Sequence, residues 1–290
     1  MAKLAAKPEP SFAGRIKKIA SRKIDPLHIS SSVKRFFGLT TLAAALAVAC
    51  VRAADPAAGP TSAAELAARL DSLREGSALI RSKLEIRSPD VGQRVLQLQI
   101  KERRTKTSTD LVYQVLWPNE LKGEAVILHQ GQGGSKGSII VPNQPVRTIK
   151  GSQMNEGLFD SDLSYQDALE NFFAWKKQAI VGSEVINGVN CQILESKPDS
   201  SAASLYARVR SWIDPQRFVP MRIEKYSSSG GLVRRIDITR VARDEKHNPI
   251  PASLIVHGPR KASVTEFNGA RIDQDVNFTD ADFTAAGILR

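Results

Sequence analysis

Residues 95–101 are Val-Leu-Gln-Leu-Gln-Ile-Lys, and residues 111–118 are Leu-Val-Tyr-Gln-Val-Leu-Trp-Pro. In the first stretch every second residue from Leu96 to Ile100 is apolar, and glutamines fill the positions between. Because successive side chains of a β-strand point to opposite faces of the sheet, this period of two predicts a half-buried antiparallel strand. In the second stretch Leu111, Tyr113, Val115 and Trp117 alternate with Val112, Gln114 and Leu116 until Pro118, where the strand should end.

The same period extends over most of the chain beyond Leu84. Typical turn sequences separate the runs, such as Asn187-Gly188 and Asn248-Pro249. About eleven strands in one meander predict an α+β protein built on a large open or partly closed antiparallel sheet. Besides the two stretches above, we expect strands at 124–130, 138–141, 177–181, 189–195, 205–213, 219–226, 232–241, 253–257 and 262–267.

Two segments have helical features. Leucines at helical spacing follow Ser62, which with Glu65 forms a capping-box sequence, so we expect an amphipathic helix of about four turns ending near Gly76. Residues 161–175 predict a second, short helix. We expect both helices to pack on the concave side of the sheet.

The formal net charge of +11 is concentrated at the N-terminus. Residues 1–54 hold ten of the 41 Lys and Arg residues but only two of the 30 acidic residues, which leaves the body at +3. This distribution argues against nucleic-acid binding by the body of the protein. With only Cys50 and Cys191, a disulfide-stapled scaffold is also excluded, and we expect Cys191 to be a buried, inert thiol.

Residues 34–49 place Lys34 and Arg35 before an uncharged, mostly apolar run that ends in small residues. This order is typical of a secretory signal, and the run is shorter than the ~20 residues that span a bilayer. We therefore expect an N-terminal extension and signal peptide at 1–53, a linker at 54–61 and one domain at 62–290. In the alternative interpretation, Ala47-Val48-Ala49-Cys50 is a lipobox, and Cys50 is lipidated and anchors the protein to a membrane.

Gly133-Gly134-Ser135-Lys136-Gly137 matches the nucleophile-elbow pattern G-x-S-x-G, and Asp214 and His257 follow in the order of a hydrolase triad. An elbow needs a helix after the serine, whereas Ser135 is followed by an expected strand at 138–141. We therefore favour a glycine-rich hairpin loop and expect no enzyme. A secreted esterase that uses Ser135 is the alternative.

Other polar residues point to structural roles. The histidines have no metal-ligand spacing, so we expect neither a metal nor a cofactor. Asp160 and Asp162 precede the second expected helix and are interpreted as its N-terminal caps. The arginines of the later strands are interpreted as a solvated outer face: Arg208, Arg210, Arg234, Arg235, Arg240 and Arg243.

Four segments occur in an order that resembles a known bacterial family. They are Tyr-Gln-Val-Leu-Trp-Pro at 113–118 with Leu-Lys-Gly at 121–123, Phe-Asp-Ser-Asp-Leu-Ser-Tyr-Gln-Asp at 159–167, Trp-Ile-Asp at 212–214 with Val-Pro-Met-Arg-Ile-Glu at 219–224, and Phe-Thr-Asp-Ala-Asp-Phe-Thr at 278–284. The resemblance is to the outer-membrane lipoprotein-sorting proteins, a periplasmic LolA-like group. It implies a curved half barrel whose concave apolar face is covered by helices and holds acyl chains. It also implies traffic of a lipid or lipoprotein between the inner and outer membranes, often beside a membrane exporter.

A sheet with few helices to cover it should have an apolar groove, which is filled either by a ligand or by the protein itself. Together with such a groove, the resemblance implies a monomeric periplasmic carrier of acyl chains, with an inner-membrane exporter and an outer-membrane acceptor as partners. A structural envelope module with a self-filled core is a further alternative. The period-two phase gives the groove lining as Leu96, Leu98, Ile100, Tyr113, Val115, Leu205, Val209, Ile213, Met221, Ile223, Ile236 and Ile238.

Overall fold

The computed structural model describes residues 62–89, 92–199, 204–244, 246–259 and 262–289. The expected extension, signal peptide and linker, and the possible lipidation of Cys50, lie outside these residues. Within the described part of the chain, no helix is long and apolar enough to cross a membrane.

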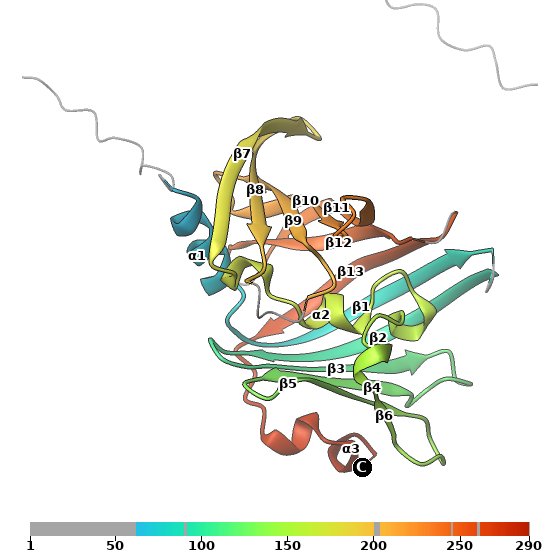
Figure 1. Ribbon diagram of the computed structural model, residues 1–290. Helices are drawn as coiled ribbons and strands as arrows, with labels where there is room; N and C mark the ends of the chain where they lie inside the picture. The colour runs from blue at the N-terminus through green and yellow to red at the C-terminus, as the bar shows by residue number, and fades with distance from the viewer. Residues whose placement is uncertain (1–61, 90–91, 200–203, 245, 260–261, 290) are drawn as a thin grey trace, which may run out of the picture. The chain divides into compact units, whose positions relative to one another are not determined.

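An unclosed, curved antiparallel sheet dominates the structure (Figure 1). The described residues form thirteen strands in the spatial order β6-β5-β4-β3-β2-β1-β13-β12-β11-β10-β9-β8-β7. Strands that follow one another in the sequence pair with each other, except for β6 and β7, and the first strand also pairs with the last. The strands are β1 (Gly76–Ser88), β2 (Gly92–Arg104), β3 (Thr109–Trp117), β4 (Ala125–Gly131), β5 (Gly134–Ile140), β6 (Arg147–Ile149), β7 (Lys177–Ile186), β8 (Val189–Lys197), β9 (Arg208–Asp214), β10 (Val219–Tyr226), β11 (Leu232–Arg243), β12 (Pro249–His257) and β13 (Val264–Gln274).

This order confirms the α+β half barrel and locates most of the expected strands. Leu96, Leu98 and Ile100 are buried on the inner face of β2, whereas Gln97 between them is exposed. Two strands were missed, β1 over most of its length and β6. In β1 the consecutive apolar residues Ala78, Leu79 and Ile80 break the alternation of apolar and polar positions.

The first helix, α1 (Ala63–Ser72), begins with the expected capping box. The Glu65 amide donates to Ser62 Oγ at 3.2 Å, and the Ser62 amide donates to Glu65 Oε2 at 3.2 Å. The expected length of four turns is wrong, because the helix has ten residues and β1 already begins at Gly76. Gly76, the first residue of β1, has a φ of +128°, a backbone conformation that favours glycine.

Strands β6 and β7 lie at opposite edges of the sheet, so the chain between them has to cross from one edge to the other. We call residues 150–176 the crossover segment. It lies in the concavity of the sheet (Figure 1). It contains only short helical pieces: the 3-10 turns η1 (Gly151–Gln153), η2 (Leu158–Asp160) and η3 (Phe172–Ala174), and the five-residue helix α2 (Tyr165–Leu169).

The interpretation of Asp160 and Asp162 as helix caps is wrong. The N-cap of α2 is Ser164, which forms a capping box with Asp167. Asp162 is instead buried, and its Oδ2 accepts hydrogen bonds from Ser263 Oγ at 2.8 Å and from Thr265 Oγ1 at 3.0 Å. These two bonds fasten the crossover segment to the start of β13.

A C-terminal segment packs on the outer face of β2. It contains the 3-10 turn η4 (Asp280–Phe283) and the short helix α3 (Ala285–Ile288). Lys101 Nζ donates to Asp282 Oδ1 at 2.8 Å, and this bond, with the Thr279 hydrogen bonds, lowers the pKa of Asp282 to about 2. The Arg103 guanidinium lies 4.6 Å from the centre of the Phe283 ring.

We expect Asp162→Ala to lower the free energy of unfolding by about 2–4 kcal/mol, because it removes a charged acceptor from two buried hydroxyl groups. Asp273→Ala on the outer face of β13 is the matched control, since Asp273 pairs with the largely exposed Arg271. That variant should change the same free energy by less than about 1 kcal/mol. Urea unfolding followed by circular dichroism measures both, and equal losses would show that Asp162 does not anchor the crossover segment.

Candidate functional site

Five of the twelve expected lining residues lie together on the inner face of β2 and β3: Leu96, Leu98, Ile100, Tyr113 and Val115. They belong to one buried cluster, in which apolar side chains of the crossover segment also take part. Those side chains are Met154, Leu158, Tyr165, Ala168 and Leu169. The crossover segment therefore covers this part of the expected groove.

The other expected lining residues are divided among different clusters. Val209 and Ile213 are buried in a cluster with α1, Phe172 and Phe173, and Ile223 packs against it while remaining partly exposed. Ile236 and Ile238 form a further cluster with Val256, which Ile223 also contacts.

Two of the expected lining residues lie elsewhere. Leu205 is 44% exposed and precedes β9, which begins at Arg208 and not at residue 205. Met221 belongs to a separate cluster with Trp212 and Val219. The pairing of β9 with β10 shifts in register beside Met221, and such a shift disrupts the simple alternation of faces.

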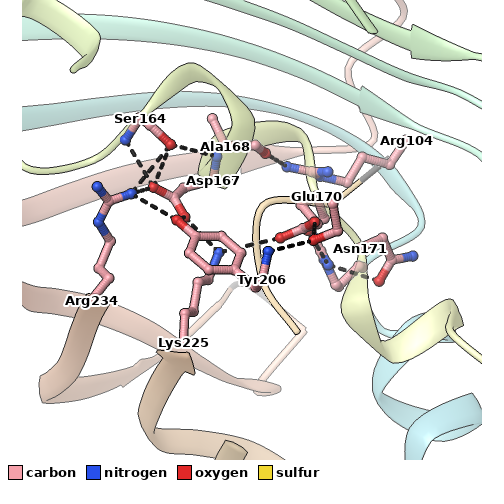
Figure 2. Close-up of polar contacts among 11 residues, drawn as sticks. Arg104, Ser164, Asp167, Ala168, Glu170, Asn171, Tyr206, Lys225 and Arg234 are labelled. Atoms are coloured by element: carbon pink, nitrogen blue, oxygen red, sulfur yellow. Dashed lines mark hydrogen bonds and ion pairs between the residues drawn. The ribbon is translucent and has the colours of Figure 1, made fainter. Parts of the chain in front are cut away.

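A buried polar cluster lies where the crossover segment meets β10 and β11 (Figure 2). Its centre is the Asp167 carboxylate of α2, which is fully buried. Asp167 Oδ1 accepts hydrogen bonds from Lys225 Nζ at 2.7 Å and from Tyr206 Oη at 2.8 Å. Asp167 Oδ2 accepts from Ser164 Oγ at 2.6 Å and forms an ion pair with Arg234.

The cations of this cluster are almost as buried as the carboxylate. The side chains of Lys225 and Arg234 are 1% and 7% exposed, and they lie opposite each other on paired strands. Burial lowers the pKa of the Lys225 ammonium to about 8, while the Glu170 carboxylate favours its charged form. Burial also raises the pKa of the Tyr206 phenol, so this side chain is a hydrogen-bond donor at neutral pH.

Further contacts tie the end of α2 to its surroundings. Glu170 Oε1 accepts a hydrogen bond from Ser204 Oγ at 2.5 Å. Arg74, after α1, donates to Asn171 Oδ1 at 2.8 Å, and Arg104 at the end of β2 donates to the Ala168 carbonyl at 3.0 Å. The crossover segment is thus held in place by polar contacts from several elements.

The sequence interpretation missed this cluster, and it assigned Arg234 wrongly to the solvated outer face. The signal was nonetheless present. Arg234 continues the inward phase of Ile236 and Ile238, and Lys225 continues that of Ile223. A cation at a position where the strand period expects an apolar residue indicates a buried partner of opposite charge.

The triad expected for an esterase does not form. Ser135 lies in β5, Asp214 ends β9 and His257 ends β12, and no two of these three strands are neighbours in the sheet. Asp214 is engaged by the amide of Gln216 at 2.9 Å and by Arg217. The hairpin expected at residues 133–137 is confirmed, but its turn is confined to residues 132–133, and residues 134–137 already belong to β5, which pairs with β4. Cys191 is buried with a free thiol, as expected, and burial raises the pKa of this thiol.

A separate pocket of about 390 Å³ lies on the outer face beside the C-terminal segment. His129 Nδ1 lies 2.6 Å from Asp110 Oδ1 in this pocket. None of the expected lining residues takes part. Its lining is Arg103, Ser108, Asp110, Ile127, Leu128, His129, Asp280 and Phe283. Among the residues that the structure describes, no group of three or more His, Cys, Asp or Glu side chains is placed to hold a metal ion.

Solved structures with the same fold include proteins from three bacteria. A DUF1329 family protein from Desulfovibrio piger has 19% identity and a TM-score of 0.71, with 78% of this chain and 97% of that chain covered. A putative outer membrane lipoprotein-sorting protein domain from Vibrio parahaemolyticus has 16% identity and a TM-score of 0.70, with coverage of 79% and 98%. A LolA superfamily protein from Nitrosomonas europaea has 16% identity and a TM-score of 0.60, with coverage of 78% and 98%.

A search of curated proteins finds no match to the chain. A family model with the description "Uncharacterized protein" matches residues 92–290, more than half of the chain. The fold resemblance inferred from the four sequence segments is confirmed by the structural neighbours. The chain therefore belongs to the family that this model describes, and its fold is that of the LolA-like outer-membrane lipoprotein-sorting proteins.

Proposed function

We propose that the protein is a carrier that binds acyl chains of a lipid or lipoprotein on the concave face of its sheet. The observation that carries this proposal is the nature of the cover. The apolar inner face is closed by the crossover segment, which has short helical pieces instead of one regular helix. A helix of five residues is not stable by itself, so the segment keeps its position only through contacts with the sheet.

The energetics of exchange support a displaceable cover. An acyl chain gains roughly 0.8 kcal/mol for each methylene group that it buries. Apolar residues of the crossover segment, such as Leu158 and Leu169, now occupy the inner face of β2 and β3. A ligand that takes their place exchanges one apolar contact for another, which favours reversible binding without covalent chemistry.

The remaining features of the proposed role draw on the structural neighbours, two of which are named for lipoprotein sorting or the LolA superfamily. We propose a periplasmic protein, exported by its N-terminal signal and acting as a monomer. It would receive its cargo from an inner-membrane exporter and deliver it to an outer-membrane acceptor.

One observation favours a second candidate, a structural envelope module with a self-filled core. Most expected lining residues are buried by the protein's own side chains in this structure. Ligand binding distinguishes the two candidates, because only a carrier exchanges its cover for an acyl chain.

The first test is the identity of co-purified material. We expect native mass spectrometry of the gently purified, exported protein to show bound lipid that is released on unfolding. The mass of the protein in the same spectrum also identifies its mature N-terminus. A protein free of lipid that also fails to bind an added fluorescent fatty acid would contradict the carrier and support the self-filled module.

The second test is Ile223→Trp on the inner face of β10. We expect it to weaken binding of a fluorescent fatty acid about tenfold or more by filling the ligand space. Because Ile223 is only partly buried, the loss of stability should stay below the roughly 1–3 kcal/mol that overpacking a closed core costs. Ile255→Trp is the matched control.

Ile255 is a suitable control because it lies on the outer face of β12. Its paired neighbours are Asp237 and Glu266, on the face opposite Val256. Ile255→Trp should leave fatty-acid binding unchanged. Equal effects of the two tryptophan variants on binding would contradict a ligand on the inner face.

A further inference from the structure

Three buried donors of the sheet side converge on one carboxylate of the crossover segment. The donors are Lys225 of β10, Arg234 of β11 and Tyr206, which precedes β9. Each of the three residues is at least nine-tenths buried. The carboxylate, Asp167, belongs to the segment that has to move if an acyl chain enters.

Displacing Asp167 would leave two cations side by side in a poorly solvated place. Lys225 and Arg234 are directly paired across β10 and β11, and a buried charge without a partner is costly. The crossover segment can therefore leave at moderate cost only if another anion replaces its carboxylate. A neutral ligand offers no such replacement.

We propose that Lys225, Arg234 and Tyr206 form a site for the anionic headgroup of the ligand, and that Asp167 occupies this site when the carrier is empty. This inference rests on the proposed carrier function and adds a chemical class to the cargo. Carboxylate and phosphate groups share the required chemistry, since both accept several charge-assisted hydrogen bonds.

The position of the site fits an amphiphile with its chain on the inner face. The pair Lys225 and Arg234 directly follows the pair Ile223 and Ile236 on the same face of β10 and β11. The Phe172 ring centre lies 5.5 Å from Lys225 Nζ. A headgroup between the two cations would thus place its acyl chain along the apolar residues next to them.

The ligand class is tested with three probes that share one alkyl chain: dodecanoate, dodecyl phosphate and dodecanol. We expect the full-length protein to bind the two anions about tenfold or more tightly than the alcohol, the gain expected from charge-assisted hydrogen bonds. A preference for one anion over the other would tell a fatty-acid cargo from a phosphate-bearing one. Inorganic phosphate alone should bind far more weakly, and equal binding of it would overturn a site built for an amphiphile.

The competition by Asp167 is tested with Asp167→Asn, which nearly preserves the side-chain volume and removes the negative charge. Because this change weakens only the closed state, we expect dodecanoate to bind about tenfold more tightly than it binds to the unmodified protein. Unchanged or weaker binding by a folded Asp167→Asn protein would overturn the proposal that Asp167 and the headgroup compete.

Tyr206→Phe is a second variant, and it keeps every charge in place. Tyr206 donates to the anion in both the empty and the loaded state, so its loss should cancel in dodecanoate binding. For dodecanol, the variant weakens the closed state with which the ligand competes and removes no bond to the ligand, so its affinity should rise. The ratio of the affinities for dodecanoate and dodecanol should therefore fall about fivefold or more. Tyr226→Phe, at the end of β10, is the control, and its ratio should equal that of the unmodified protein.

Hydrogen exchange reports the movement itself. We expect dodecanoate to increase exchange of the backbone amides in residues 164–170, and dodecanol to have little effect. Equal affinities for acid and alcohol, or unchanged exchange with bound dodecanoate, would overturn the headgroup site while leaving the carrier intact. Failure of all three amphiphiles to bind would instead overturn the proposed carrier function.

Discussion

The chain between β6 and β7 has to bridge the two edges of a wide sheet, and the rest of the structure depends on this constraint. Because β1 pairs with β13 in the middle of the sheet, strands β1 to β6 extend from the middle to one edge. Strands β7 to β13 extend from the other edge back to the middle. The bridge then runs through the concavity, where it meets the apolar side chains of both halves. The topology alone therefore places a covering segment over the face on which a ligand would lie.

Besides its apolar packing, the bridge is joined to the sheet through polar groups in an apolar setting. Asp162 meets the hydroxyls of Ser263 and Thr265, and Asp167 meets Lys225 and Arg234. Apolar packing alone would tolerate many positions of a segment with so little regular structure, whereas buried charges have few acceptable partners. We interpret these contacts as the means by which the empty protein holds one defined arrangement.

The sequence predicted the sheet well because alternation is a strong signal where one face is buried. For β2 and β10 the period of two gave the element and, for most residues, its inward face. The assignment of residues to the inward face failed where this rule is broken, as at Met221 beside a register shift and at Leu205 outside β9. The polar cluster could not be predicted as a whole, since Asp167, Tyr206 and Arg234 meet only through long-range pairing. Only the two cations in apolar phase, Lys225 and Arg234, pointed to it.

The pairing of β1 with β13 also has a consequence for the order of events during folding. The first strand of the sheet cannot acquire its second neighbour until almost the whole chain is present. Until then β1 offers an open edge, with unpaired backbone groups that can associate with other chains. Pairing over such a large sequence separation is also slow. The protein should therefore fold late and gain from protection against aggregation while its last strand is still being made.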